Sequence, residues 1–556
     1  MRIEGVRKRL TLGMSASAVE PKFHTSGLIR LTRPQMFATM TGLILALLLA
    51  ALDQTIVGTA EPRIIAQLSG FDRYPWVSTT YLLTSTLAVP IFAKLSDMYG
   101  RKWFFLGGST LFVFASALCG ASGTLTFLGL DGMNQLIIFR GLQGIGAGMM
   151  MGLAFTIIGD VFSPAERGKY QGFFAAAWGL ASIFGPTLGG WLTDHVSWRA
   201  CFYVNLPVGL IAIAAIYFQF PELHPDGVKR RLDWAGLFSL MLCIAPLLLA
   251  LTWVTNYGWS STRVESLLAF SVVMLAVFLR AETKAIEPLI PLSLFRNPII
   301  SLCSIAVFLL GMGMFGVIIY LPLFMQGVLG ASATQSGNLL TPLMMGAVAG
   351  SILTGQLNLR LGSYKLSAVS GSVLVSIGMI LFARMGESTQ RMDVVLAMII
   401  AGFGMGLLQP VYTVAVQNVA PRKYMGAATA STVFFRSIGS TLGVAIFGSV
   451  LLTSYHHDLM AGIPAGTPPA ALKLFSNPLL LVQLRPKLDA TFGSSPAGIH
   501  LLQMLLANVR IGLLHGLQRI FFASAVIMTL AIILHVLLRD VPLRRHHAPE
   551  PEIPVG

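Results

Sequence analysis

Long apolar segments recur along almost the whole chain. Between residues 37 and 540 the sequence contains fourteen of them, each of about 20 residues, the length that crosses the hydrocarbon core of a bilayer. Hydrophobic residues make up 55% of the 556 residues, charged residues only 11%, and the mean hydropathy is +0.74. Backbone polar groups inside a bilayer need internal partners, so segments of this kind are expected to be helices. The sequence predicts an all-α, multi-pass protein of the cell membrane.

Positive charge is distributed unevenly between the predicted loops, and the formal net charge is +15. If residues 1–36 form a cytoplasmic tail, 25 of the 38 lysines and arginines lie on the inner side. This asymmetry predicts that both termini are cytoplasmic. It also accounts for the net charge, so we expect no nucleic-acid partner. The four cysteines stand singly in apolar segments, which is typical of core residues, and we expect no metal or other cofactor.

Two related halves with an insertion between them are predicted. The stretch at 93–102 resembles that at 355–365, and Gly146-Ile-Gly148 resembles Gly404-Met-Gly406 at a similar offset. This offset is longer than six spans require, so it leaves room for two more. The predicted organisation is a cytoplasmic tail, a six-helix bundle, two inserted helices with their loops, a second six-helix bundle and a C-terminal tail, at residues 1–36, 37–220, 221–299, 300–540 and 541–556.

The second bundle includes a long outer loop at residues 455–516. Its last part, residues 499–517, mixes apolar residues with histidine, glutamine, asparagine and arginine. This mixture predicts an amphipathic helix that lies at the outer membrane interface and leads into the last span.

Asp53 is the only acid well inside a predicted span, and Arg140 is a cation near the start of another. An ion in hydrocarbon is costly, so it normally faces a partner or a wet cavity. A buried carboxylate near a cation can load and release a proton in different conformations. Alternatively, Asp53 simply pairs with Arg140 or caps a break in the helix. The two interpretations are compatible.

Glycines follow Arg140 and also end the next span. The first set allows a neighbouring backbone to approach closely, and the second includes a proline that is expected to kink its helix. No strand precedes the first set, which argues against a dinucleotide-binding loop. The two sets are Gly141, Gly144, Gly146 and Gly148, and Gly185, Pro186, Gly189 and Gly190.

These motifs resemble those of the major facilitator superfamily. Arg140 with its glycines looks like the fourth-helix motif, and residues 181–190 (ASIFGPTLGG) are similar to the exporter-specific fifth-helix motif. Residues 52–57 (LDQTIV) resemble the first-helix motif of the fourteen-span drug:proton antiporters of the EmrB/QacA type. The resemblance implies the major facilitator fold, two six-helix bundles plus two inserted helices, with substrate bound between the halves. It also implies that Arg140 assists proton transfer and that Gly185-Pro186 limits flexing of the fifth helix against the span at 335–358.

Residues 93–102 (AKLSDMYGRK) are similar to the superfamily's loop between its second and third helices. The resemblance implies a latch that stabilises the outward-open state. Gly100 permits the tight turn of this loop. The second-half copy has Leu359 where the first has its acid, so we expect a one-sided latch. Its residues are Asp97, Gly100, Arg101 and Lys102.

Glu61 departs from the family pattern, in which an apolar residue usually precedes the proline. One interpretation places Glu61 at the outer membrane surface in a local ion pair with Arg63. The other makes it a second acid that attracts cationic substrates near the outer exit. Trp198-Arg199 and Asn205-Leu-Pro207 are typical of the fourteen-span exporters, and we assign them a structural role in an outer loop.

Aromatic, methionine and glutamine side chains suit a cavity that binds unlike lipophilic molecules, although plain packing is the better explanation for any one of them. Arg436 either contacts acidic groups or phospholipid near the inner leaflet, or lies at a solvated helix end. The candidate cavity residues are Gln54, Tyr320, Phe324, Gln326, Gln409, Tyr412 and Arg436.

The sequence therefore predicts a monomeric, proton-coupled antiporter that exports lipophilic, cationic drugs or toxic compounds by alternating access. It predicts a secondary active transporter and no enzyme. An alternative keeps the fold and exports lipid, siderophore or peptide-like cargo. A more distant alternative is a membrane-embedded enzyme acting on lipids, but the sequence shows no helix-borne His-Glu metal motif and no Asp-rich diphosphate site.

Overall fold

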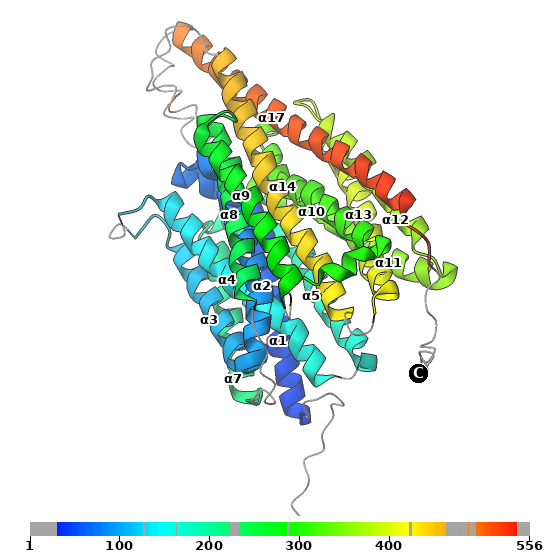
Figure 1. Ribbon diagram of the computed structural model, residues 1–556. Coiled ribbons are helices and arrows are strands. Elements are labelled where there is room, and N and C mark those ends of the chain that lie inside the picture. The colour runs from blue at the N-terminus through cyan, green and yellow to red at the C-terminus, as the bar shows by residue number, and fades with distance from the viewer. Residues whose placement is uncertain are drawn as a thin grey trace, which may run out of the picture.

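The structure, a computed structural model, describes residues 31–125, 129–162, 164–222, 233–285, 288, 290–421, 425–462, 478, 488 and 496–541. Residues 1–30 and 542–556 of the predicted tails lie outside the described residues, and so does half of the predicted outer loop, at 463–477, 479–487 and 489–495. Helices account for nearly all of the rest (Figure 1). In chain order they are α1 (Arg33–Leu68), η1 (Phe71–Arg73), α2 (Tyr74–Tyr99), α3 (Arg101–Gly120), α4 (Gly132–Val161), α5 (Pro164–His195), α6 (Ala200–Tyr203), α7 (Asn205–Gln219), α8 (Trp234–Tyr257), α9 (Thr262–Lys284), η3 (Leu292–Arg296), α10 (Pro298–Leu323), η4 (Phe324–Val328), α11 (Ala333–Leu361), α12 (Lys365–Ala383), α13 (Arg391–Val419), α14 (Met425–Gly462) and α17 (Pro496–Leu537).

The all-α membrane architecture is confirmed. Within the described ranges, thirteen helices are long and apolar enough to cross a membrane. The predicted fifth span is helical as α5 but is not among these thirteen. Helix α5 carries several glycines, Pro186 and polar residues along its length, which lowers its hydropathy.

Helix α1 is longer than its apolar segment. It runs for 36 residues, passes through Pro62 and ends at Leu68, and the next residue, Ser69, has a left-handed φ of 54°. A proline removes one backbone donor, and a packed membrane helix tolerates that loss. Residues 60–68 are therefore helical, and Glu61 lies inside α1 and not in a surface segment after it.

Neighbouring helices repeat between the two halves of the chain. In the first half α1 packs against α5 and α7, while α2 and α3 pack against α4. In the second half α10 packs against α14 and α17, while α11 and α12 pack against α13. The inserted helices α8 and α9 pair with each other, and α8 contacts α14 (Figure 1). The residue boundaries of the two bundles stay a prediction.

Small residues on two faces of α4 bring three helices together. A Cβ at Gly144 or Gly148 would contact backbone atoms of Tyr81 or Ser85 in α2. A Cβ at Gly146 would contact the backbone of Phe112 and Gly108 in α3. Glycine is thus required where α4 touches both neighbours, as expected for packing in a membrane.

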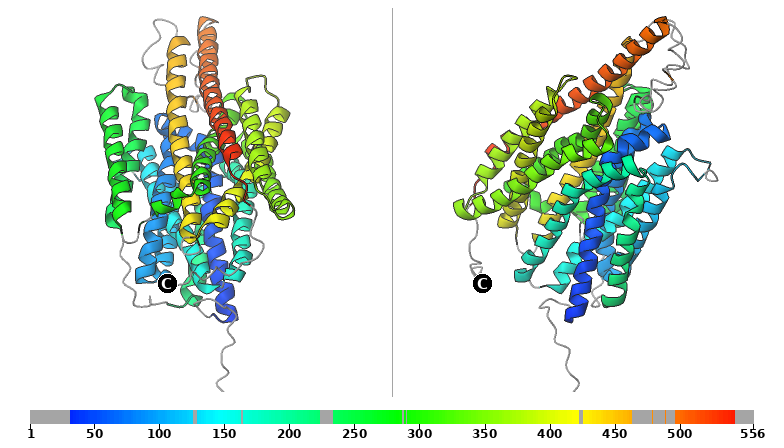
Figure 2. Two further views of the ribbon diagram at one scale, coloured as in Figure 1. Left: turned by 45° about the vertical axis from the view of Figure 1, so that its right-hand side comes forward. Right: turned by 180° about the vertical axis from the view of Figure 1, so that it is seen from behind.

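The two halves meet at the ends where α1, α5 and α14 finish, which the charge distribution predicts to be the outer side. On this side the hydroxyls of Thr187 and Thr341 lie 3.3 Å apart, and Asp194 of α5 accepts a 2.7 Å hydrogen bond from the Thr334 amide of α11. Gln326 of η4 donates to the Thr59 carbonyl of α1 at 3.0 Å. In the right-hand view of Figure 2 the halves converge at this side and spread toward the other. The two halves are therefore in contact at this end of the described structure.

The interfacial helix predicted at 499–517 is not a separate element. Those residues belong to α17, one continuous helix of 42 residues that includes the last span. Apolar residues of this segment, Leu502, Leu505, Val509 and Leu513, are buried in the protein core, so its apolar face packs on protein. Figure 2 shows the outer ends of α14 and α17 rising beyond the other helices.

Candidate functional site

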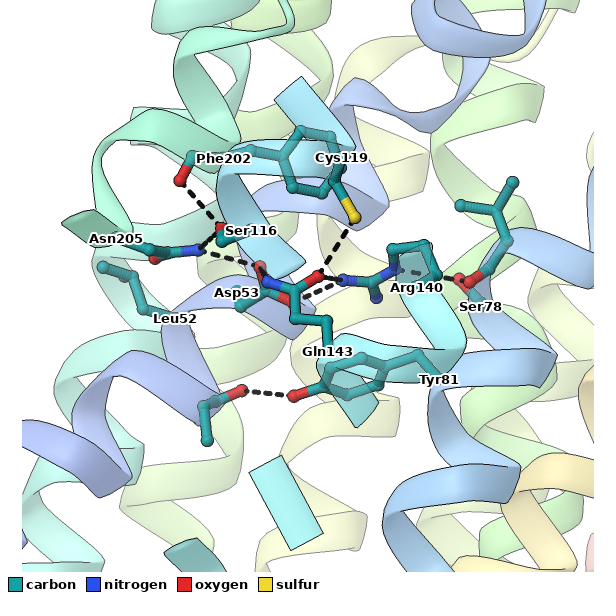
Figure 3. Close-up of polar contacts among 12 residues, drawn as sticks. Leu52, Asp53, Ser78, Tyr81, Ser116, Cys119, Arg140, Gln143, Phe202 and Asn205 are labelled. Atoms are coloured by element: carbon teal, nitrogen blue, oxygen red, sulfur yellow. Dashed lines mark hydrogen bonds and ion pairs between the residues drawn. The ribbon is translucent and has the colours of Figure 1, made fainter. Parts of the chain in front are cut away.

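Asp53 of α1 and Arg140 of α4 form an ion pair inside the first half. The Arg140 Nη1 and Asp53 Oδ2 atoms lie 2.5 Å apart. Asp53 is fully buried, and Arg140 is 2% exposed. The sequence predicted this partnership as one of two compatible interpretations of Asp53, and the structure brings the two residues together (Figure 3).

Two amide side chains complete the surroundings of the Asp53 carboxylate. Its Oδ1 atom accepts from Gln143 Nε2 at 2.8 Å and from Asn205 Nδ2 at 2.9 Å. Gln143 also accepts from Arg140 Nη1 at 2.8 Å. Asp53 therefore receives three hydrogen bonds, one of them from a cation, and this arrangement suits an ionised carboxylate.

Aromatic rings and backbone groups hold the Arg140 guanidinium. Its Cζ atom lies 4.1 Å from the centre of the Tyr81 ring, in cation–π geometry. Its Nε atom donates to the Val77 carbonyl at 3.4 Å. Both partners are on α2, which Gly144 allows to approach α4 closely. The glycine motif and the arginine are thus parts of one arrangement.

The amides of Gln143 and Asn205 were not among the predicted site residues. Asn205 was assigned to an outer loop, but it is the first residue of α7, and its side chain bridges Asp53 and Ser116. That assignment was wrong for Asn205. It holds for Trp198, which donates to Gln67, and for Arg199, which stacks on Trp198 and donates to the Ser122 carbonyl. Gln143 follows Arg140 by about one helical turn, and this spacing was an available signal.

Glu61 does not form the local ion pair with Arg63 that the first interpretation predicted. Arg63 is exposed, whereas Glu61 is fully buried and accepts from Ser78 Oγ at 3.0 Å. The reason is the continuation of α1 through Pro62, which turns residues 61 and 63 to different faces of the helix. Asp53 is therefore not the only acid buried in a membrane helix.

The fifth-helix motif contacts both halves. A Cβ at Gly185 or Gly189 would contact Thr55 or Ile56 of α1. On another face, the Pro186 carbonyl lies against Gly337 and Gly190 lies against Ala333, both in α11. Helix α11 contains the predicted span at 335–358, so α5 packs against the helix that the resemblance named.

The loop motif at 93–102 forms the turn between α2 and α3. Gly100 has a φ of 104°, a conformation that favours glycine. Arg101 Nη1 donates to Ser96 Oγ at 2.9 Å, and Lys102 Nζ lies 5.8 Å from the centre of the Tyr217 ring of α7. The side chain of Asp97 lies outside the described part of the structure, so the predicted latch acid stays a prediction.

The candidate cavity residues divide into two groups. Tyr320, Phe324 and Tyr412 are buried and packed: Tyr320 donates to the Val444 carbonyl, Phe324 contacts the Phe521 ring, and Tyr412 lies 2.9 Å from His535 Nε2. Gln54, Gln326, Gln409 and Arg436 are half-buried. Arg436 donates to Gln409 at 2.8 Å from within α14, so it is not at a helix end.

The chain is similar to a known family of proteins and to several of its members. The model of the Major Facilitator Superfamily matches residues 43–444. Multidrug transporter protein MdtP of Bacillus subtilis (strain 168) is 36% identical over 523 residues, covering 92% of this chain and 94% of that protein. Multidrug resistance protein 3 of the same organism is 38% identical over 446 residues, covering 80% and 85%.

A solved structure shares the fold. The crystal structure of a bacterial homolog to the human lysosomal transporter Spinster, inward-facing and unoccupied, has a TM-score of 0.61 at 16% identity and covers 92% of this chain and 100% of that one. The thirteen apolar helices fit a multi-pass protein of the cell membrane. The chain therefore belongs to the major facilitator superfamily, as a membrane transporter in a family with bacterial multidrug efflux proteins.

Proposed function

We propose that this protein is a proton-coupled antiporter that exports lipophilic, cationic compounds by alternating access, as a monomer. The observation that carries the proposal is the buried Asp53–Arg140 pair with its two amide donors, in a chain related to multidrug transporters. Buried ionisable groups in membrane helices are expensive, and they mark ion pathways and proton relays.

The coupling step is the protonation of Asp53. In the described arrangement the carboxylate compensates the charge of Arg140. A proton on Asp53 cancels the negative charge and leaves the guanidinium with Gln143, the Tyr81 ring and the Val77 carbonyl. The pair that joins α1 to α4 is then weakened. A ligand shifts a conformational equilibrium only through such differential interactions.

Close packing carries this change toward the interface between the halves. Helix α1 touches α5 through Gly185 and Gly189, and α5 touches α11 through Pro186 and Gly190. A shift of α1 against α4 therefore reaches the contact between α5 and α11. At the inner end, the turn with Gly100, Arg101 and Lys102, together with Asp97, acts as the latch of the outward-open state.

The half-buried residues Gln54, Gln409 and Arg436 are proposed to face the cargo. A second candidate cargo is an amphipathic lipid with an anionic group. The observation that favours it is Arg436, a cation in a membrane helix whose hydrogen-bond partner in the described residues is the neutral Gln409. A guanidinium in such a place suits a carboxylate or phosphate.

The test is substrate-driven proton movement in energised inside-out vesicles. Lipophilic cations and anionic lipids are added in separate series to the native protein, to Asp53→Asn and to Glu265→Gln. Glu265 is an exposed acid on α9, so its amide variant is a matched control. We expect proton release with cations from the native protein and from the control, and none from Asp53→Asn.

Each other outcome has a definite meaning. Proton movement that persists in Asp53→Asn would overturn the role of Asp53. Proton movement with anionic lipids and none with lipophilic cations would show that the cargo is the lipid and not the cation. No movement with either series, from protein that is correctly inserted, would overturn proton antiport.

A further inference from the structure

Glu61 is a second buried acid, and half of its carboxyl group has no partner. Its Oε1 atom accepts one hydrogen bond from Ser78 Oγ at 3.0 Å. Its Oε2 atom is buried and makes no hydrogen bond among the described residues. The side chain is fully buried. An oxygen of this kind in a native protein requires an explanation.

The surroundings of Glu61 belong to both halves of the protein. Tyr74 of α2 and Tyr320 of α10 stack with ring centres 5.5 Å apart at 29°, and both lie within electrostatic range of Glu61. The Tyr74 hydroxyl is buried and, in the part of the chain that the structure describes, has no hydrogen-bond partner. Glu61 therefore lies beside the aromatic contact that closes the outer side.

The titratable groups around Glu61 do not neutralise a negative charge there. The cation within electrostatic range is Arg140 of α4, which already pairs with Asp53 and Gln143. The other groups are the phenols of Tyr74 and Tyr320, from α2 and α10. An ionised carboxylate in this buried place loses its hydration, and a single hydroxyl donor does not replace it. A neutral carboxylic acid carries no charge and avoids this cost.

We infer that Glu61 is a second proton-binding site, which carries a proton when the outer ends of the two halves are closed and releases it when they open. An ionised Glu61 beside the Tyr74–Tyr320 contact disfavours closure, and a protonated Glu61 permits it. Low pH outside would then close the outer side after cargo has left. This inference rests on the proposed efflux function, but it concerns a different acid and a different step from Asp53.

A pair of spin labels measures the distance between the outer ends of the two halves, which we call the outer gap. This measurement needs no transport assay. We would place them by Ser69→Cys at the end of α1 and Met460→Cys near the end of α14, which are both exposed. These sites lie on either side of the interface where the Phe71 and Tyr455 rings are 5.3 Å apart. The four native cysteines are buried, so the labels go to the introduced ones.

The labelled protein is compared with its Glu61→Gln and Asp53→Asn variants as the pH is raised. We expect a short distance at acidic pH and a longer distance at alkaline pH in the native background. Glu61→Gln should stay short at every pH, because its side chain is always neutral. Asp53→Asn should keep the pH-dependent shift even when it no longer transports. If Glu61→Gln does not fold, Glu61→Leu, neutral and of similar volume, replaces it.

Infrared spectroscopy provides a second readout at acidic pH. The carbonyl stretch of a protonated carboxylic acid should be present in the native protein and lost in Glu61→Gln. A gap that opens with the same pH dependence in Glu61→Gln as in the native background would overturn the inference. The inference would also be overturned by a label distance that does not change with pH in the native background, or by a carbonyl band that is the same in Glu61→Gln as in the native protein. A failure of proton antiport with an intact Glu61 response would overturn only the proposed function.

Discussion

Asp53 and Glu61 lie about two turns apart on α1, and both are fully buried, yet their surroundings differ. Asp53 accepts from Arg140, Gln143 and Asn205. Glu61 accepts from one hydroxyl and has an oxygen with no partner among the described residues. Burial alone therefore does not determine the charge of a membrane carboxyl group. The number and charge of its donors do.

Position in the fold adds to this difference. Asp53 lies within one half, where α1, α4 and α7 surround it. Glu61 lies beside the contact between halves that Tyr74 and Tyr320 form. An acid inside one bundle changes the packing of that bundle when it binds a proton. An acid at the interface changes how well two bundles fit together.

The largest expected effect comes from Arg140→Met. Removing one partner of a buried ion pair costs about 3–5 kcal/mol because the other charge is left without compensation. We expect a loss of this size in the free energy of unfolding in detergent. Adding Asp53→Asn to the same chain should recover most of the stability, but not proton-coupled transport. If the double variant were as unstable as Arg140→Met alone, the uncompensated charge of Asp53 would not be the cause of the lost stability.

A matched pair of truncations compares the donors of the two acids. Asn205→Ala removes a hydrogen bond to an ionised group, which costs about 1.5–3 kcal/mol, whereas Ser78→Ala removes one to a neutral acid, which costs about 0.5–1.5 kcal/mol. Unfolding of both variants in the same detergent gives the comparison. If Ser78→Ala were the more destabilising variant, Glu61 would be the more charged acid, and the assignment of charge would be reversed.

Much of the fold was predictable because apolar length is a local property. Asp53 and Arg140 were identified for the same reason, since few charges interrupt the spans. Asn205 was missed because its partner is set by the packing of α7 on α1, far along the chain. One of the two interpretations paired Glu61 with Arg63 because Arg63 is a near neighbour in the sequence. Only the continuation of α1 through Pro62 shows that the two side chains point apart.

The stretch of α1 between the two acids offers a third comparison. A Cβ at Gly189 of α5 would contact the Ile56 carbonyl and lie 2.5 Å from Thr59 Oγ1, whereas a Cβ at Gly58 has nothing within 4 Å. Gly189→Ala should therefore cost about 1–3 kcal/mol through overpacking. Gly58→Ala is the control and should be neutral or slightly stabilising, because alanine favours helix. If Gly189→Ala and Gly58→Ala changed the stability equally, close packing of α5 would not hold this part of α1 in place.

Asp131 is an exposed acid that pairs with an arginine, and its substitution is expected to have the smallest effect on stability. At the N-cap of α4 it accepts from the Asn134 amide at 2.7 Å and from Arg73 Nη1 at 2.8 Å, and its side chain is 52% exposed. Burial raises the pKa of Asp131, but the Asn134 amide and Arg73 outweigh this effect and lower the pKa below its usual value. A lowered pKa means that the folded state favours the ionised form.

The stability that Asp131 contributes is therefore fully present above the unfolded pKa, which is about 3.9, and is lost as the pH falls through the folded pKa. Asp131→Asn should cost less than about 1 kcal/mol at neutral pH, since water screens the pair. The difference in Tm between native protein and variant should shrink as the pH is lowered toward the folded pKa. A difference in Tm that grew as the pH was lowered would contradict the lowered pKa of Asp131. Asp131 and Asp53 both pair with an arginine, so a small effect here beside a large one at Arg140 would show that burial sets the size of the effect.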